Sequence, residues 1–222
     1  PGHDRALACR EFYIDWATVH FGAGACPLAG DLFARIDGRS MPEPSQWGTG
    51  PGLVRVNAAP WEGERKRYAF VDELEALRPR VRGAGNIERF DYWLDTYRFM
   101  RAMAQVGCAA GKLNAIVAEM SKETDPARRT EIARSRALPV RIELARLWEA
   151  MIRHQLAAVS TPGEMGTIAN LEQQSRGAAR ILNRHDPAIE KALGTPLPPE
   201  VHPSADYEGP SRIIVPTVRG LI

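Results

Sequence analysis

A long helical pattern of apolar residues between positions 83 and 117 most constrains how this chain can fold. Large and then small apolar side chains recur there every three or four residues, at Phe90, Trp93, Tyr97, Met100, Ala104, Gly107, Cys108 and Gly111. Such spacing places them on one face of an α-helix, so the pattern predicts a long helix with one buried face. Gly83 and Gly85 break the preceding segment, and Asn86 is the expected N-cap.

The second half of this face consists of small residues. A glycine in a helix interior is less favourable than alanine by about 1 kcal/mol. Gly107 and Gly111 are therefore expected either to let another helix backbone approach closely or to lie near the end of the helix.

Most of the remaining chain also shows helical patterns. Pro139 should kink or divide the longest of the other helices, because a proline inside a helix removes a hydrogen bond. The sequence therefore predicts an all-α fold, an irregular bundle of about six or seven helices. The helices expected besides the central one cover 4–21, 28–36, 68–77, 126–156, 164–175 and 177–193.

Residues 39–67 form the one long segment without a helical pattern, rich in Trp, Gly and Pro. Its two tryptophans favour an ordered loop, because disordered segments seldom carry large aromatic residues. We expect a helical domain over 1–195 that includes this loop, and a Pro-rich linker over 196–222 that ends in a β-like run. The only partner for that run within the chain would be Leu53–Val56, so we expect it to belong to a following β element.

Composition excludes several classes of function. The net charge of the 222 residues is only +2, which gives no reason to expect nucleic acid or a membrane surface as partner. No apolar run approaches the roughly 18 residues of a membrane span. The five histidines are scattered and no cysteine spacing fits a metal, so neither a metal site nor a cofactor is expected. Cys9, Cys26 and Cys108 are interpreted as buried thiols, with a Cys9–Cys26 disulfide as the alternative.

Aromatic and polar residues are dense between positions 39 and 98. Sugar rings stack on aromatic faces while amides, carboxylates and guanidinium groups bind their hydroxyls, so these residues are candidates for carbohydrate binding. The alternative is that the tryptophans pin the long loop onto the bundle. Nearby carboxylates such as Asp91 and Asp95, four residues apart, favour a solvated helix surface over a catalytic pair. The candidate binding residues are Trp47, Asn57, Trp61, Asn86, Arg89, Asp91 and Tyr92.

Two stretches resemble a known class of enzyme. The segment from Phe70 to Met103 is similar to the helical region that follows the catalytic barrel in large exported bacterial glycoside hydrolases of agarase-like type. The opening Phe12–Gly22 resembles the start of the C-terminal helical domain of α-glucuronidases, and Arg212–Arg219 resembles the entry to a following β-domain.

The resemblance implies an accessory role in an exported polysaccharide-degrading enzyme. In such an enzyme the helical module supports an adjacent (β/α)8 barrel, and it could lend Trp47, Trp61 or Tyr92 to the sugar cleft. The catalytic residues would lie outside this chain, which has at most two short strand candidates where a barrel needs eight. The alternative from a different class is a stand-alone helical module that binds a protein partner and has no catalytic activity.

Overall fold

The computed structural model describes residues 9–37, 41–46, 53–176 and 181–203. The predicted all-α bundle of about six or seven helices is confirmed: the described residues form seven helices of eight or more residues and two shorter ones, with almost no strand. In chain order the helices are α1 (Cys9–Phe21), α2 (Cys26–Asp37), α3 (Trp61–Glu64), α4 (Ala69–Leu77), α5 (Ala84–Lys122), α6 (Pro126–Ile132), α7 (Leu138–Ala158), α8 (Pro162–Arg176) and α9 (Asp186–Leu193).

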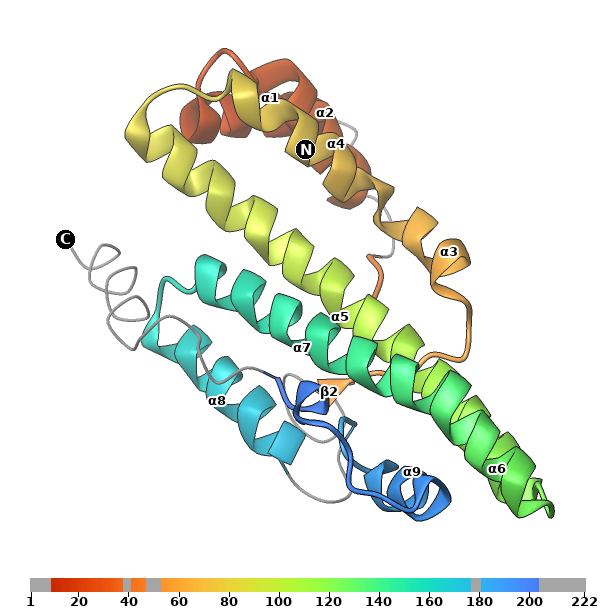
Figure 1. The fold of residues 1–222 in the computed structure, drawn as a ribbon. Helices are drawn as coiled ribbons and strands as arrows, with labels where there is room; N and C mark the ends of the chain where they lie inside the picture. The colour runs from red at the N-terminus through yellow and green to blue at the C-terminus, as the bar shows by residue number, and fades with distance from the viewer. Residues whose placement is uncertain (1–8, 38–40, 47–52, 177–180, 204–222) are drawn as a thin grey trace, which may run out of the picture.

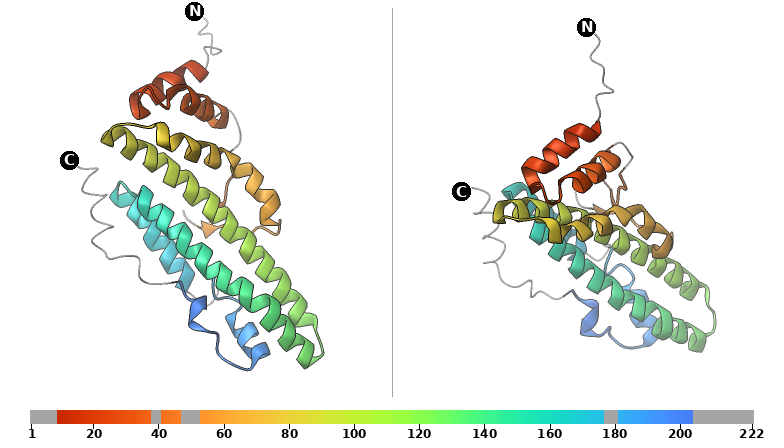
Figure 2. Two further views of the ribbon diagram at one scale, coloured as in Figure 1. Left: turned by 45° about the horizontal axis from the view of Figure 1, so that its top comes forward. Right: turned by 90° about the horizontal axis from the view of Figure 1, so that it is seen from above.

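Helix α5 runs through the length of the molecule and carries the other elements (Figure 1). At 1.5 Å per residue its 39 residues span about 58 Å. Helix α7 packs along its second half, and α1, α2 and α4 gather around its first half (Figure 2). Helix α8 lies along α7, and α9 contacts the segment around α6.

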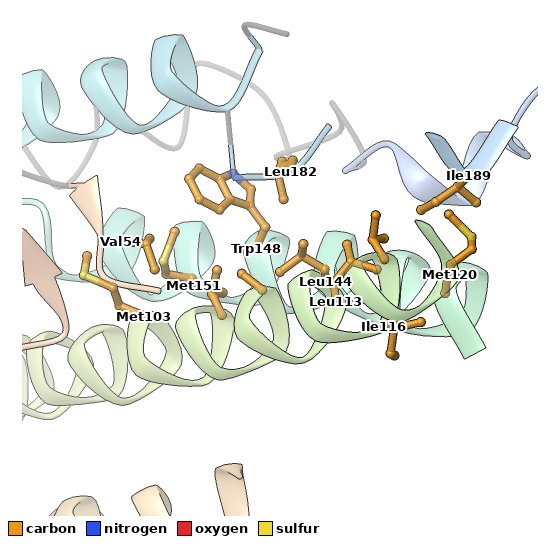
Figure 3. Close-up of a cluster of buried hydrophobic side chains, with 14 of the residues drawn as sticks. Val54, Met103, Leu113, Ile116, Met120, Leu144, Trp148, Met151, Leu182 and Ile189 are labelled. Atoms are coloured by element: carbon orange, nitrogen blue, oxygen red, sulfur yellow. The ribbon is translucent and has the colours of Figure 1, made fainter. Parts of the chain in front are cut away.

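Two hydrophobic cores share α5. The first, here called the aromatic core, joins α1, α2 and α4 to the first half of α5 and includes Phe21, Phe33, Phe90 and Tyr97. The second, the aliphatic core, joins the second half of α5 to α7 and to the segment around Leu182 and Ile189 (Figure 3). The change from large to small residues along the α5 pattern falls near the boundary between the two cores.

The small residues of α5 accept a loop backbone and not the helix that their pattern predicted. A Cβ atom added at Gly107 would clash with the carbonyl oxygen of Arg55, and one added at Gly111 would clash with that of Asn57. The Asn57 N–H also donates to the Gly107 carbonyl oxygen at 3.0 Å. Helix α5 does not end at these glycines but continues to Lys122.

The start of α5 also differs from the prediction. The helix begins at Ala84, and Gly83 occupies the N-cap position with φ of 87°, a backbone conformation that side chains disfavour. Asn86 lies inside the first turn, where its Nδ2 donates to the Arg82 carbonyl oxygen at 3.0 Å. The amide therefore stabilises the turn before the helix without capping it.

The predicted long loop contains short regular elements. Strand β1 (Ser45–Gln46) pairs antiparallel with β2 (Leu53–Val54), with Ser45 opposite Val54. Leu53–Val54 therefore pairs with Ser45–Gln46, which precedes it in the same segment. The C-terminal β-like run, for which it was considered a partner, lies outside the described residues.

A π-helical turn, Ala133–Ala137, lies between α6 and α7 with helical backbone at both junctions, so the predicted long helix continues through it and is widened just before Pro139. A proline cannot donate to the carbonyl four residues earlier, and a widened turn accommodates the missing bond.

Segment 181–203 is held to the bundle by a buried arginine. The Arg141 side chain is 1% exposed, and it donates to both carboxylate oxygens of Asp186 and to the Val201 carbonyl oxygen. The first residues of the expected linker are thus packed against α7. The three cysteines are free thiols, with Cys26 and Cys108 buried and Cys9 exposed.

The close contact at Gly111 predicts a large effect of a single methyl group. Gly111→Ala should lower the free energy of unfolding by about 1–3 kcal/mol, because overpacking against the Asn57 carbonyl exceeds the gain in helix propensity. Gly166→Ala in α8 is the matched control, since its added Cβ has no atom within 4 Å. Urea denaturation should show the control unchanged or stabilised. Equal stability of both variants would contradict the contact.

Candidate functional site

A wide groove lies between α5, α7 and the loop that precedes α3. Its volume is about 870 Å³, within the range of small-ligand sites. Trp61 and the segment Ala58–Pro60 form one edge. The opposite wall comes from Ser135 and Arg136 of the π-helical turn and from Pro139, Val140 and Leu147 of α7.

The loop contact on α5 positions Trp61 at this edge. The Asn57 side chain accepts a hydrogen bond from the Ala59 N–H at 2.9 Å, which forms a tight turn immediately before Pro60 and Trp61. Trp61 is half-buried, and its ring lies 6.3 Å from that of Tyr68, which belongs to the aromatic core. The indole is thus held from one side and borders the groove on the other.

The floor of the groove is apolar and its rim is polar. Cys108, Ala109, Gly111, Ala115 and Ile116 come from the floor side of α5. Burial, and then the charges of Glu64 and Glu62, raise the pKa of the Cys108 thiol, so it stays protonated and behaves as an apolar wall group at neutral pH. Gln105, Lys112 and Glu143 supply polar groups along the same groove.

An ion pair belongs to the lining of the groove. Arg136 of the π-helical turn donates to both carboxylate oxygens of Glu119, at 2.5 and 2.8 Å. This bidentate geometry fixes the orientation of the guanidinium. Lys112 is exposed and has no ion-pair partner among the described residues.

Four other predicted site residues, Asn86, Arg89, Asp91 and Tyr92, lie on the first half of α5 and make structural contacts. The Arg89 Nη2 donates to the Asn86 Oδ1 at 2.7 Å, and its Nε donates to the His20 carbonyl oxygen at 3.0 Å, which joins α5 to the end of α1. Asp91 receives two hydrogen bonds from Arg78. The Tyr92 hydroxyl donates to Glu164 at 3.0 Å.

The structure therefore brings Asn57 and Trp61 together at the groove, and separately brings Asn86 next to Arg89. Tyr92 and Cys108 are about 24 Å apart along α5, so the first half of this helix does not reach the groove. Trp47 lies outside the described residues. Lys112, Glu119, Arg136 and Glu143 were not singled out from the sequence, because nothing in their spacing shows that α7 lies against that face of α5.

Glu164, the partner of Tyr92, completes a capping box at the start of α8. Its carboxylate accepts hydrogen bonds from the backbone N–H and hydroxyl groups of both Ser160 and Thr161, and the Thr161 hydroxyl accepts from the Glu164 N–H. Burial alone would raise the pKa of Glu164, but the hydrogen bonds from Ser160, Tyr92 and Thr161 outweigh it and lower the pKa.

The described residues contain no group of three or more His, Cys, Asp or Glu side chains placed to hold a metal ion. Nor is any helix in the described ranges both long and apolar enough to cross a membrane. Comparison with protein-family models, with curated proteins and with solved structures finds no match. The geometry alone thus defines the molecule as an all-α bundle with an open groove beside Trp61.

The capping box predicts a pH-dependent contribution to stability. A carboxyl group whose pKa is lowered on folding stabilises the protein above its unfolded pKa, and that contribution is lost as the pH falls through the folded pKa. Glu164→Gln should lower the free energy of unfolding by about 1 kcal/mol at neutral pH, and the difference from the parent protein should shrink below about pH 4.5. Urea denaturation between pH 3 and pH 7 measures it. A difference that is independent of pH would contradict the hydrogen-bonded carboxylate.

Proposed function

We propose that this chain is the helical accessory module of a multidomain polysaccharide-degrading glycoside hydrolase, with Trp61 at the edge of a carbohydrate subsite. The resemblance of segment Phe70–Met103 to helical regions of such enzymes suggests the class. The groove of about 870 Å³ beside the half-buried indole is the observation that supports a sugar contact. In an exported enzyme of this kind, the module would support the adjacent barrel.

The composition of the groove suits an oligosaccharide. A sugar ring presents an apolar face that stacks on an indole and an edge of hydroxyl groups that require donors and acceptors. Trp61 can supply the stacking surface, while Gln105, Lys112 and Glu143 can supply the hydrogen-bond donors and acceptors. An open groove also admits a chain that continues at both ends.

Three carboxylates of described residues line the groove, those of Glu62, Glu119 and Glu143. Glu119 is held by Arg136, whereas Glu62 and Glu143 form no ion pair among the described residues. Glycoside hydrolysis requires two carboxyl groups that face each other across the bond to be cleaved. We assign catalysis to residues outside this chain because the resemblance implies that the catalytic carboxylates lie in the adjacent barrel.

A stand-alone protein-interaction module is the second candidate. One observation favours it: Phe12 and Val19, seven residues apart on α1, are 63% and 74% exposed, and Leu28 on α2 is 46% exposed. Apolar side chains that cluster on one exposed face often mark a protein interface. An interaction module would bind no member of an oligosaccharide series.

Sugar binding at Trp61 can be tested with this chain and with any longer polypeptide that contains it. Agar-derived and xylan-derived oligosaccharides would be titrated while intrinsic tryptophan fluorescence is recorded. Trp61→Ala should weaken binding about 5- to 30-fold and lower the melting temperature only slightly, because the indole is half-buried and stacks on the sugar with its open side. Tyr92→Phe is the matched control, since it removes a hydroxyl far from the groove and should bind normally.

Two outcomes would contradict the proposal. If Trp61→Ala lowers the melting temperature strongly while sugar affinity is unaltered, Trp61 serves to pin its loop. If no oligosaccharide changes the fluorescence of the parent protein, the interaction module becomes the better explanation.

A further inference from the structure

A second cavity lies at the opposite end of the molecule, between α1, α2 and the first half of α5. Its volume is about 340 Å³, near the lower end of the range for small-ligand sites. It is here called the aromatic cleft. Six aromatic rings line it, from Phe12, Tyr13, Trp16, Phe33, Trp93 and Tyr97.

These rings form one connected wall. The Phe33 ring centroid lies 4.8 Å from that of Trp16 and 5.6 Å from that of Trp93, both in edge-to-face contact. Tyr97 adjoins Trp93 at 5.8 Å. Phe33 and Tyr97 are buried, whereas Tyr13, Trp16 and Trp93 are only half-buried, so aromatic surface remains open to the cleft.

A single carboxylate lies at the rim of the aromatic cleft. Asp37 is the last residue of α2 and is exposed, and no described Lys, Arg or His forms an ion pair with it. The nearest arginine on the same helix, Arg35, pairs with Glu73 at 2.5 Å. A negative charge at a helix C-terminus is unfavourable, because the macrodipole is already negative there. The rim therefore has a negative potential that the described residues leave uncompensated.

Tyr13 adds a hydroxyl group beside this carboxylate. Burial, followed by hydrogen bonding to Asp37, raises the pKa of Tyr13, so the hydroxyl remains a donor at neutral pH. This contact holds the carboxylate beside the rings. The negative charge and the aromatic wall thus belong to one site.

We propose that the aromatic cleft binds a small organic cation with a quaternary or N-methylated ammonium group. Aromatic rings attract a cation through the negative potential of their faces, and an alkylated ammonium also gains from apolar contact because it is weakly hydrated. The Asp37 carboxylate balances the charge. The inference rests on the cleft alone and does not depend on carbohydrate binding at Trp61.

Other ligand classes fit the aromatic cleft less well. A metal ion requires several ligating oxygen, nitrogen or sulfur atoms, and the rim offers one carboxylate. A sugar requires several hydrogen-bonding groups for its hydroxyls, and beyond Asp37 the described lining side chains offer only the tyrosine hydroxyls and the indole N–H groups. An anion would be repelled by Asp37 and by the end of α2.

Choline and its neutral isostere dimethylbutanol, in which carbon replaces the ammonium nitrogen, provide the test. Both have the same shape, so a purely apolar cleft would bind them equally. We expect choline to change the fluorescence of Trp16 and Trp93 with saturation, and the alcohol to bind about tenfold more weakly. Isothermal titration calorimetry would supply the dissociation constants.

Asp37→Asn removes the charge without changing the volume, and should weaken choline binding about tenfold. Asp15→Asn is the matched control, because Asp15 is an exposed carboxylate on α1 that does not line the cleft, and it should bind normally. Phe12→Ala provides a second variant at the mouth, where Phe12 is 63% exposed and its loss should leave the fold intact. This variant should weaken binding about twofold.

Three results would overturn the proposal. Equal affinity for choline and the alcohol would define a merely apolar cleft. Unchanged choline binding by Asp37→Asn would show that the charge of Asp37 does not contribute to the affinity. Absence of binding up to about 50 mM choline would reject the site itself, since that limit corresponds to less than about 2 kcal/mol of binding free energy.

Discussion

The burial of two different faces of one helix organises this structure. Helix α5 supplies Phe90, Leu94 and Tyr97 to the aromatic core and Leu113, Ile116 and Met120 to the aliphatic core. Burial of each large apolar side chain contributes about 1.5–3 kcal/mol, so both cores depend on the continuity of this helix. Between the two sets, Gly107 and Gly111 admit the backbone that leads to Trp61. The position of the groove is therefore a consequence of how α5 is packed.

Arginines account for most of the polar contacts around the first half of α5. Arg98 and Arg101 share the carboxylate of Glu75, and Arg101 also pairs with Asp72, which joins α4 to α5. Burial alone would raise the pKa of Glu75, but hydrogen bonds and charges from the two arginines lower it. A shared carboxylate immobilises fewer side chains than separate pairs would. The charged residues of α4 and of the first half of α5 therefore join these two helices.

The helices could be predicted from sequence because their signals are local. Apolar spacing located α2, α4 and α5, and the segment Thr161–Glu164 indicated a helix start that the structure realises as a capping box. The glycines of α5 indicated a close approach but not its partner, since a missing side chain accommodates a loop as readily as a helix. The aromatic cleft joins Tyr13 to Tyr97 across distant parts of the chain, and periodicity within one helix carries no information about such contacts.

The two cavities differ in electrostatic character, and this difference separates the ligands they can accept. Around the groove, Lys112 and the Arg136–Glu119 pair place both signs of charge beside Glu62 and Glu143, which suits a neutral ligand with many hydroxyl groups. Among the described residues that line the aromatic cleft there is one carboxylate, Asp37, and no cation. Desolvating a neutral sugar requires replacement of its hydrogen bonds, whereas desolvating an alkylated cation requires mainly a compensating charge. The same helix can therefore present two sites that do not compete for one ligand.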